Sequence, residues 1–243
     1  MKILTWNAWY KESPENIRKF LEDTQWDVCC LQEVTVGFHT DTHSDVATYL
    51  TESLGIAGHF VVAQSWNGGE RSQGNLILSK LPVKDTFSYF IQDYNHELES
   101  SFSDEGRVVV GIELENSLKI LTTHMSYTSR FEETDKKNVE AGRLIEYLKG
   151  TEQPFVLCGD LNAVPTSNLI QRLGQDYNNL SPNFLEPTWT TKPFSHEGFV
   201  VDTLAYRLDY IFGSKEVELI SSAIIQTEYS DHLPIISEVE VKL

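Results

Sequence analysis

The chain of 243 residues is long enough for one large α/β domain or two small ones, and its formal charge of −17, from 19 Lys and Arg against 36 Asp and Glu, disfavours long polyanionic partners. The three cysteines are an odd number in apolar runs, which argues against a disulfide framework and indicates buried thiols in a reducing compartment. No apolar run approaches the roughly 20 residues that span a bilayer, and the N-terminus lacks the layout of a secretion signal, so we expect a cytoplasmic protein without a membrane span.

The first part of the chain predicts strands that alternate with helices. One apolar run ends in Asn7, and a second over residues 28–32 ends in Glu33. Amphipathic helices are predicted over residues 14–25 and 45–54, each with a capping residue before it or a glycine after it. This alternation indicates a mixed α/β fold.

The rest of the chain is rich in predicted strands, with two further helices. Strands are predicted over residues 60–63, 75–79, 83–91, 107–115 and 118–123. Helices are predicted over 131–149 and 165–173, and the segments 66–74 and 185–199 have the composition of long loops. Strand-rich parts separated by helices predict two mainly antiparallel sheets packed face to face with helices outside, a four-layer α/β sandwich.

Polar side chains stand at or beside the ends of six apolar segments. They are Asn7, Glu33, His124, Asp160 with Asn162, Asp209, and the pair Asp231-His232. Strand ends commonly collect ligands and catalytic groups, so we expect these residues to form one site. Because the site would draw on both ends of the chain, any split would divide it, and we predict a single domain over residues 1–243.

Two of these positions suit a hard cation. Asn7 and Glu33 offer oxygen ligands from neighbouring strands, and Mg²⁺ is typically held by one or two carboxylates together with water and substrate phosphate. A lone Asn or Glu at a strand end is more often a turn former, but here further acids gather at the same place. We therefore predict metal binding at Asn7 and Glu33.

The other polar strand ends suit proton transfer. Asp160 and Asn162 are spaced by two on an extended segment, so the carboxylate and the amide face the same way, towards water and phosphate. His232 follows Asp231, and Asp209 is available from another strand. This combination is typical of sites in which a carboxylate orients an imidazole. A protonated His232 would stabilise a pentavalent phosphoryl group, and a neutral one would deprotonate water. Asp160 and His232 both stay open as the general base.

Two further polar side chains are candidates for the substrate. His124 could donate to a phosphate oxygen, and Arg107 could bind phosphate or pair with Asp231 or Glu33. Motifs for other mechanisms are missing, because the sequence has no Gly-x-Ser-x-Gly elbow, no Gly-rich phosphate loop ending in Lys-Ser/Thr and no His-Glu-x-x-His. Metal-assisted attack of water on a phosphate ester is the chemistry that remains.

Aromatic side chains in the predicted loops could contact a substrate. The candidates are Trp9, Tyr10, Tyr127, Trp189 and Phe194, which could stack on bases or sugars or could belong to the core. The histidines outside the six segments show no ligand spacing, and we expect them on the surface. They are His39, His43, His59, His96 and His196.

The polar strand ends lie within longer motifs. These are Thr5-Trp6-Asn7, Leu31-Gln32-Glu33-Val34, Gly74-Asn75-Leu76-Ile77-Leu78-Ser79, Thr123-His124, Gly159-Asp160-Leu161-Asn162, Arg207-Leu208-Asp209-Tyr210 and Ser230-Asp231-His232-Leu233-Pro234. In this order, and over nearly the whole chain, they closely resemble the endonuclease/exonuclease/phosphatase superfamily, which includes deoxyribonuclease I, exonuclease III, neutral sphingomyelinases and inositol polyphosphate phosphatases. The motifs are specific for the superfamily and not for a substrate.

The resemblance implies roles at the matching positions. It implies a site for Mg²⁺, with Mn²⁺ as a substitute, at Asn7, Glu33 and Asp231. It also implies catalytic roles for His124, Asp160, Asn162, Asp209, Asp231 and His232, in which Asp209 orients His232. Apurinic endonucleases carry Tyr in place of His124, so the resemblance is closer to the deoxyribonuclease I and sphingomyelinase branches than to apurinic repair enzymes.

The expected activity is hydrolysis of a phosphodiester or phosphomonoester. The candidate substrates are DNA, a protein–DNA adduct, a lipid head group and a small phosphorylated molecule, with Arg107, Trp9, Tyr127 and Trp189 as the candidate substrate-binding residues. The alternative from another class is a catalytically silent binding module. No obligate protein partner is expected.

Overall fold

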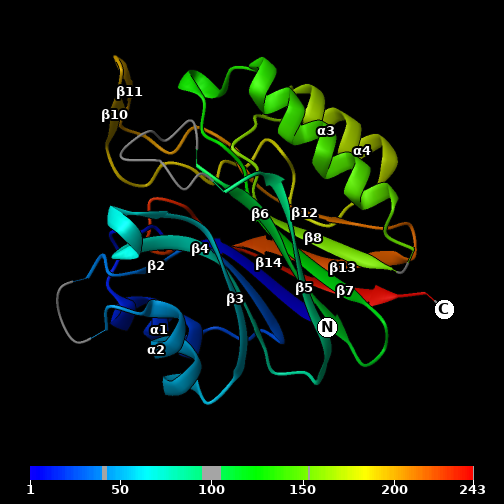
Figure 1. Cartoon of the computed structure of the whole chain (residues 1–243). Coiled ribbons are helices and arrows are strands. Elements are labelled where there is room, and N and C mark those ends of the chain that lie inside the picture. Colours follow the sequence, from blue (N-terminus) through cyan, green and yellow to red (C-terminus); the bar gives the residue numbers. More distant parts are fainter. Residues whose placement is uncertain (40–42, 95–104, 153, 243) are drawn as a thin grey trace.

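Two six-stranded sheets pack face to face in the computed structural model, which describes residues 1–39, 43–94, 105–152 and 154–242 (Figure 1). The first sheet has the order β13-β14-β1-β2-β4-β3 and the second has the order β5-β6-β7-β8-β12-β9. Only the central pairs β1–β2 and β7–β8 are parallel among the described strands, and the other pairs are antiparallel. The predicted sandwich of mainly antiparallel sheets is confirmed.

The strands of the two sheets come from both ends and the middle of the chain. The first sheet comprises β1 (Lys2–Asn7), β2 (Val28–Val36), β3 (Ala57–Trp66), β4 (Arg71–Ser79), β13 (Val217–Ile224) and β14 (Ile235–Val241). The second comprises β5 (Val83–Gln92), β6 (Arg107–Leu114), β7 (Lys119–His124), β8 (Phe155–Asp160), β9 (Asn178–Asn179) and β12 (Asp209–Gly213). A separate hairpin is formed by β10 (Phe194–His196) and β11 (Phe199–Val201).

Helices cover the outer face of each sheet (Figure 1). The helices α1 (Pro14–Asp23) and α2 (Val46–Leu54) pack on the first sheet, and α3 (Asp135–Lys149) and α4 (Asn168–Asp176) pack on the second. Each helix begins after a side chain that accepts a hydrogen bond from its first turn, which satisfies one of the unpaired amide groups there. Two short 3-10 turns, Asn67–Gly69 and Ser129–Phe131, complete the regular structure. No helix of the described residues is long and apolar enough to cross a membrane.

Alternation along the central strands builds separate apolar layers. In β2, Val28 and Cys30 belong to the layer between the sheets, whereas Cys29 and Leu31 point to α1 and α2. This follows from the period of two in a strand, which sends successive side chains to opposite faces. All three cysteines are buried and free, in agreement with the prediction of unpaired thiols.

Buried polar side chains connect the two sheets close to the strand ends that carry the site. Gln32 on β2 donates from Nε2 to the hydroxyl of Thr122 on β7 at 2.8 Å, and Asn75 on β4 donates to the carbonyl of Val108 on β6 at 3.0 Å. Buried polar groups are costly unless they are paired, so these bonds favour one relative position of the sheets.

Several predicted boundaries differ from the observed ones. The loop predicted over 66–74 is mostly strand, because β3 runs to Trp66 and β4 starts at Arg71. The third helix begins at Asp135 and not at residue 131, because Thr134 caps it and Phe131 packs into an aromatic cluster. The loop predicted over 185–199 contains β10 and the start of β11.

Candidate active site

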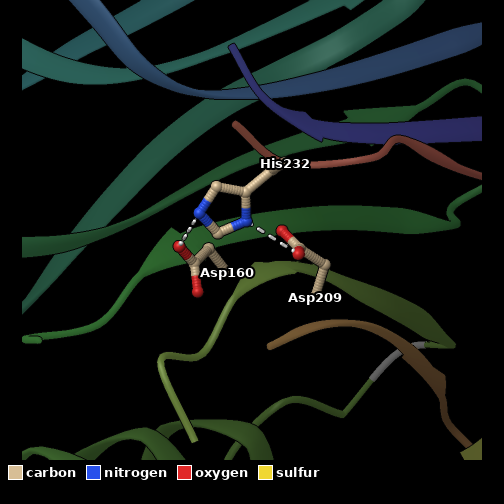
Figure 2. Close-up of side chains that lie close together, drawn as sticks. All are labelled: Asp160, Asp209 and His232. Carbon is tan, nitrogen blue, oxygen red and sulfur yellow. Dashed lines mark hydrogen bonds and ion pairs between the residues drawn. The ribbon is translucent and has the colours of Figure 1, made fainter. Parts of the chain in front are cut away.

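The strand registers bring the polar ends of the second sheet together. His124 is the partner of Asp160 in the parallel pair β7–β8, and Asp209 is the partner of Asp160 in the antiparallel pair β8–β12. His232, from the turn before β14, reaches this row from the first sheet (Figure 2). The residues predicted from these four distant segments therefore meet at one edge of the sandwich.

His232 lies between two buried carboxylates. Its Nδ1 is 2.9 Å from Asp209 Oδ2 and its Nε2 is 3.5 Å from Asp160 Oδ2 (Figure 2). Burial by itself would lower the pKa of His232, but the charges of Asp209 and Asp160 outweigh it and raise the pKa well above its usual value. His232 is accordingly an imidazolium that donates from Nδ1 to Asp209 and forms an ion pair through Nε2 with Asp160.

Asp160 is buried, with 1 % of its surface exposed. Burial raises the pKa of Asp160 to about 7, although the charge of His232 acts in the opposite direction. Its Oδ2 accepts from Asn7 Nδ2 at 3.1 Å, and its Oδ1 accepts from the backbone amide of Asn162 at 2.8 Å. The carboxylate is thus held in one orientation.

The turn that carries His232 is tied to β1. Ser230 donates from its hydroxyl to the carbonyl of Asn7 at 2.7 Å and accepts from the backbone amide of His232 at 3.0 Å. The indole of Trp6 donates to the carbonyl of His232 at 3.1 Å. These bonds explain why Ser stands before Asp231-His232 and why Trp stands before Asn7.

Glu33 was predicted at the end of a strand, but it reaches the site from a bulge within β2. Pairing with β4 is interrupted between Leu31 and Val34, and Glu33 has a φ of 58°. A bulge of this kind turns a side chain away from the regular alternation. Glu33 accepts from Asn7 Nδ2 at 3.1 Å and from the backbone amide of Tyr10 at 3.0 Å.

Asn7 bridges two acids in this structure. Its Nδ2 donates to both Glu33 and Asp160, while its Oδ1 accepts from the backbone amide of Trp9 at 3.0 Å. The amide of Asn7 therefore faces the acids with its nitrogen, and half a turn of the amide would present Oδ1 in its place. The predicted metal-binding oxygen of Asn7 is engaged by the backbone.

Asp231 has one paired and one unpaired oxygen. Its Oδ2 accepts from the indole of Trp189 at 3.2 Å, and its Oδ1 is buried without a hydrogen-bond partner among the described residues. Burial raises the pKa of Asp231, and burial followed by the charge of Asp231 raises that of Glu33. Two desolvated acids that repel each other form a group that a divalent cation would stabilise.

A second group of side chains has the spacing of a metal site. Asp160, Asp209 and His232 each place one ligand atom within 4.8 Å of the others. However, an imidazolium carries a proton on each nitrogen and has no lone pair for a metal. We therefore describe this group as an ion-paired triad.

His124 and Asn162 support each other. Asn162 Nδ2 donates to His124 Nε2 at 3.1 Å and to the carbonyl of Met125 at 2.9 Å. Burial and then the charge of Arg107 lower the pKa of His124 well below its usual value, so the ring is neutral and its Nε2 accepts. The sequence predicts that His124 and Asn162 donate hydrogen bonds to phosphate. For that, the bonds of Asn162 to His124 and Met125 would have to break.

Arg107 pairs with neither Asp231 nor Glu33. Its guanidinium donates to Glu105 at 2.8 Å and to the hydroxyl of Ser126 at 3.2 Å. Ser126 also donates its backbone amide to Glu140 on α3 at 3.1 Å. Sequence reasoning did not identify Glu105, Ser126 or Glu140. Charged residues on the apolar face of the predicted helix were the signal for Glu140.

Lys137 is a second charged residue on that face of α3, and only 5 % of its surface is exposed. Its ammonium donates to the carbonyl of Asn162. Burial lowers the pKa of Lys137 from 10.5 to about 8, against the attraction of Asp160. Lys137 thus ties α3 to the segment after β8.

Lys137→Met is expected to remove a pH dependence of stability. Below pH 8 the Lys137 ammonium is protonated in both the folded and the unfolded protein, and burying its charge lowers the free energy of unfolding. As the pH rises from 8 towards 10.5 the folded state loses the proton first, so stability rises by up to about 3 kcal/mol. Urea denaturation across this range should show the rise in the wild type and in the exposed-lysine control Lys149→Met. If the free energy of unfolding changes with pH in the same way in the wild type and in Lys137→Met, the burial of the Lys137 charge is not the cause of the rise.

The polar groups open into a pocket of about 400 Å³. Trp9, Tyr127 and Trp189, the predicted aromatic contacts, all line it. Tyr10 and Phe194, the other two aromatic residues expected from the sequence to stack, line it as well, and the lining residues that sequence reasoning missed are Lys11, Gln73, Glu105, Phe131, Lys192, Pro193, Ser195 and His196. His196, expected on the surface, lines the pocket with a side chain that is 40 % exposed. His96 lies outside the described residues. Asp209 does not line the pocket, because it lies behind His232.

Comparison with known proteins gives a family match and a set of similar structures. The model of the Endonuclease/Exonuclease/phosphatase family matches residues 4–232. A functionally unknown conserved protein from Enterococcus faecalis has a TM-score of 0.73 at 15 % identity, with 100 % of both chains covered. No curated protein sequence matches the chain significantly.

Two further similar structures have described activities or ligands. The human Nocturnin catalytic domain with a bound sulfate anion has a TM-score of 0.69 at 19 % identity, covering 100 % of this chain and 94 % of that one. A mannosyl-6-phosphatase from Bacteroides thetaiotaomicron has a TM-score of 0.68 at 12 % identity, covering 99 % of each chain. At these identities the likeness is one of fold.

Proposed function

Because the chain belongs to the Endonuclease/Exonuclease/phosphatase family, we propose that it hydrolyses a phosphate ester by attack of water, with the help of a divalent cation. The observation that carries this proposal is the buried row Asp209–His232–Asp160 at the inner end of an open pocket. A histidine in a surface turn or in a purely structural ion pair need not be both buried as an imidazolium and exposed to a cavity of substrate size. The combination therefore favours a catalytic site. The likeness to a sugar phosphatase is compatible with this chemistry and does not determine the substrate.

Asp160 is the proposed general base. Its carboxylate lines the pocket and is oriented by Asn7 and the amide of Asn162, whereas the imidazolium of His232 carries a proton on each nitrogen and cannot accept another. Asp160 would accept the proton of the attacking water as the new P–O bond forms and the ester P–O bond breaks. The leaving oxygen would take its proton from solvent in the open pocket.

His232 is the proposed electrostatic stabiliser. Held as an imidazolium by Asp209, it places positive charge beside the carboxylate that faces the substrate. Charge fixed in a buried site stabilises the extra negative charge of a pentavalent phosphoryl group without reorganisation. Asn162 and His124 would orient Asp160 and close that side of the pocket.

Glu33 and Asp231 are the proposed acidic metal ligands, with Asn7 beside them. The unpaired buried Oδ1 of Asp231 and the mutual repulsion of the two acids fit a hard cation, and Mg²⁺ with Mn²⁺ as a substitute is the proposed ion. Such an ion supplies positive charge for the phosphate and lowers the pKa of water. Asn7 would take part through Oδ1 after its amide has turned.

Removal of divalent metal is expected to lower hydrolysis of bis-p-nitrophenyl phosphate and p-nitrophenyl phosphate by at least about 100-fold. EDTA-treated protein, before and after addition of Mg²⁺ or Mn²⁺, provides the measurement. Binding gives a second readout, since Mg²⁺ should raise the melting temperature of the wild type and not that of Glu33→Gln. Activity that survives chelation would overturn the metal mechanism.

The alternative of a silent binding module leads to a different result in the same assay. If both phosphate esters stay intact with Mg²⁺ and with Mn²⁺, the proposed hydrolysis is wrong. A cytoplasmic location and a single domain over residues 1–243 remain part of the proposal.

A further inference from the structure

One wall of the pocket is built from the hairpin β10–β11 and the segment before it. Lys192, Phe194, Ser195 and His196 line the pocket from this side. The hairpin projects beyond the two sheets (Figure 1). The wall therefore encloses space above the catalytic residues that an open sheet edge would leave to solvent.

Aromatic packing holds the wall in place. The ring of Phe194 lies 5.0 Å from that of Trp189 and 5.7 Å from that of Tyr127, and Phe199 lies 6.0 Å from Phe131. Offset and edge-to-face ring pairs at these separations stabilise a fixed arrangement. Since the indole of Trp189 also donates to Asp231, the same ring joins the wall to the proposed metal ligands.

The charges of the pocket suit one phosphate and not a chain of them. Arg107 is already paired with Glu105, and the ammonium of Lys11 lies over the rings of Trp9 and Tyr10 at 5.5 and 5.2 Å. The lining includes four carboxylates against four cations, which are Lys11, Arg107, Lys192 and the imidazolium of His232, so it carries no excess of positive charge. Affinity for a nucleic-acid strand rises with the number of phosphates that the protein neutralises. The net charge of −17 and this lining therefore disfavour binding of a nucleic-acid strand.

The size and the surface of the pocket suit a small molecule. A volume of about 400 Å³ lies in the range of small-molecule sites. The wall offers the ring of Phe194 for stacking, and Gln73 and Ser195 carry groups that can bond to hydroxyls. Stacking and hydroxyl recognition together are what a sugar or a nucleoside ring requires.

We infer that the substrate is a small phosphate ester with a ring, of the size of a sugar phosphate or a mononucleotide, and that the hairpin wall selects it over nucleic-acid chains. This inference rests on the proposed phosphoester hydrolysis. Phe194 contacts the ring, and the catalytic residues contact the phosphate.

A substrate panel with Mg²⁺ tests the inference through kcat/KM. The panel comprises glucose 6-phosphate, a mononucleotide in monoester and cyclic diester form, glycerol 3-phosphate, and short single-stranded and duplex oligonucleotides. We expect at least about tenfold higher kcat/KM for a ring-bearing small ester than for glycerol 3-phosphate or either oligonucleotide. Preference for glucose 6-phosphate assigns the ring to a sugar, and preference for the mononucleotide assigns it to a nucleoside.

The outcomes separate the inference from the function on which it rests. Oligonucleotides cleaved as well as the small ring-bearing esters, or glycerol 3-phosphate hydrolysed equally well, would overturn the inference and leave phosphoester hydrolysis standing. No hydrolysis of any panel member or of bis-p-nitrophenyl phosphate would overturn both.

Variants of the hairpin give a second test. Phe194→Ala should lower kcat/KM for the preferred ring-bearing ester by about tenfold, because stacking on one ring is lost, and lower it less for glycerol 3-phosphate. Phe194→Leu keeps the apolar bulk that packs on Trp189 and should show the same selective loss without loosening the hairpin. Val200→Ser is the matched control, since Val200 lies on β11, is 68 % exposed and does not line the pocket. An equal loss on both classes of ester would contradict the assignment.

Discussion

Asp160→Asn is expected to lower kcat for bis-p-nitrophenyl phosphate by about 10³-fold, the scale of a lost general base. The amide keeps the shape of the side chain and can still accept from the amide of Asn162, but it cannot take a proton from water. It also removes one of the two charges that hold His232 as an imidazolium. Steady-state kinetics at saturating Mg²⁺ measure the loss.

A matched variant separates this effect from a general change of charge. Asp176→Asn, on α4 and outside the pocket, removes the same charge and should leave kcat unchanged. The melting temperature of Asp160→Asn checks that the variant is folded at the assay temperature, because its amide nitrogen replaces the oxygen that accepts from Asn7. A loss of kcat below about tenfold would assign the proton transfer to another residue.

Asp209→Asn is expected to lower kcat by about 10³-fold although Asp209 does not line the pocket. Asp209 accepts from Nδ1 of His232, and an amide would leave the imidazole without the charge that raises its pKa. Because Asp209 touches His232 and not the pocket, KM should change little. The fall should therefore be in kcat.

A double-mutant cycle tests this reading of Asp209. If Asp209 acts through His232, adding Asp209→Asn to a His232→Ala variant should cause almost no further loss of kcat. Multiplicative losses would show that Asp209 acts on the reaction by another route. A large rise in KM for Asp209→Asn would also contradict a role limited to holding His232.

The predicted layers and the set of strand-end residues agree with the structure for a local reason. Alternation in runs such as residues 28–31 sends side chains to two faces, which is enough to predict a sandwich with helices outside. Asp160 and Asp209 end and begin their strands, so pairing of β8 with β12 places them side by side. These features follow from spacing along the chain.

Orientation within the site depends on contacts between distant segments. Glu33 enters through a bulge, Asn7 faces the acids with its nitrogen, and Arg107 pairs with Glu105. Each outcome is a competition among hydrogen bonds and ion pairs that exist only when both sheets are packed. Spacing alone left Arg107 with two other partners and His232 with two protonation states.

Taken by itself, the amino-acid sequence determined the layered α/β fold, the family and the residue types that gather at one edge, because periodicity and short motifs are properties of neighbouring residues. The tertiary structure decided the charge of His232, since that charge depends on burial and on two carboxylates from other strands. It also decided the shape of the pocket, because the wall that carries Phe194 is held by aromatic rings far apart in the chain. Desolvation and long-range packing act only in the folded molecule, so the protonation states and the enclosed volume could not be read from the order of the residues.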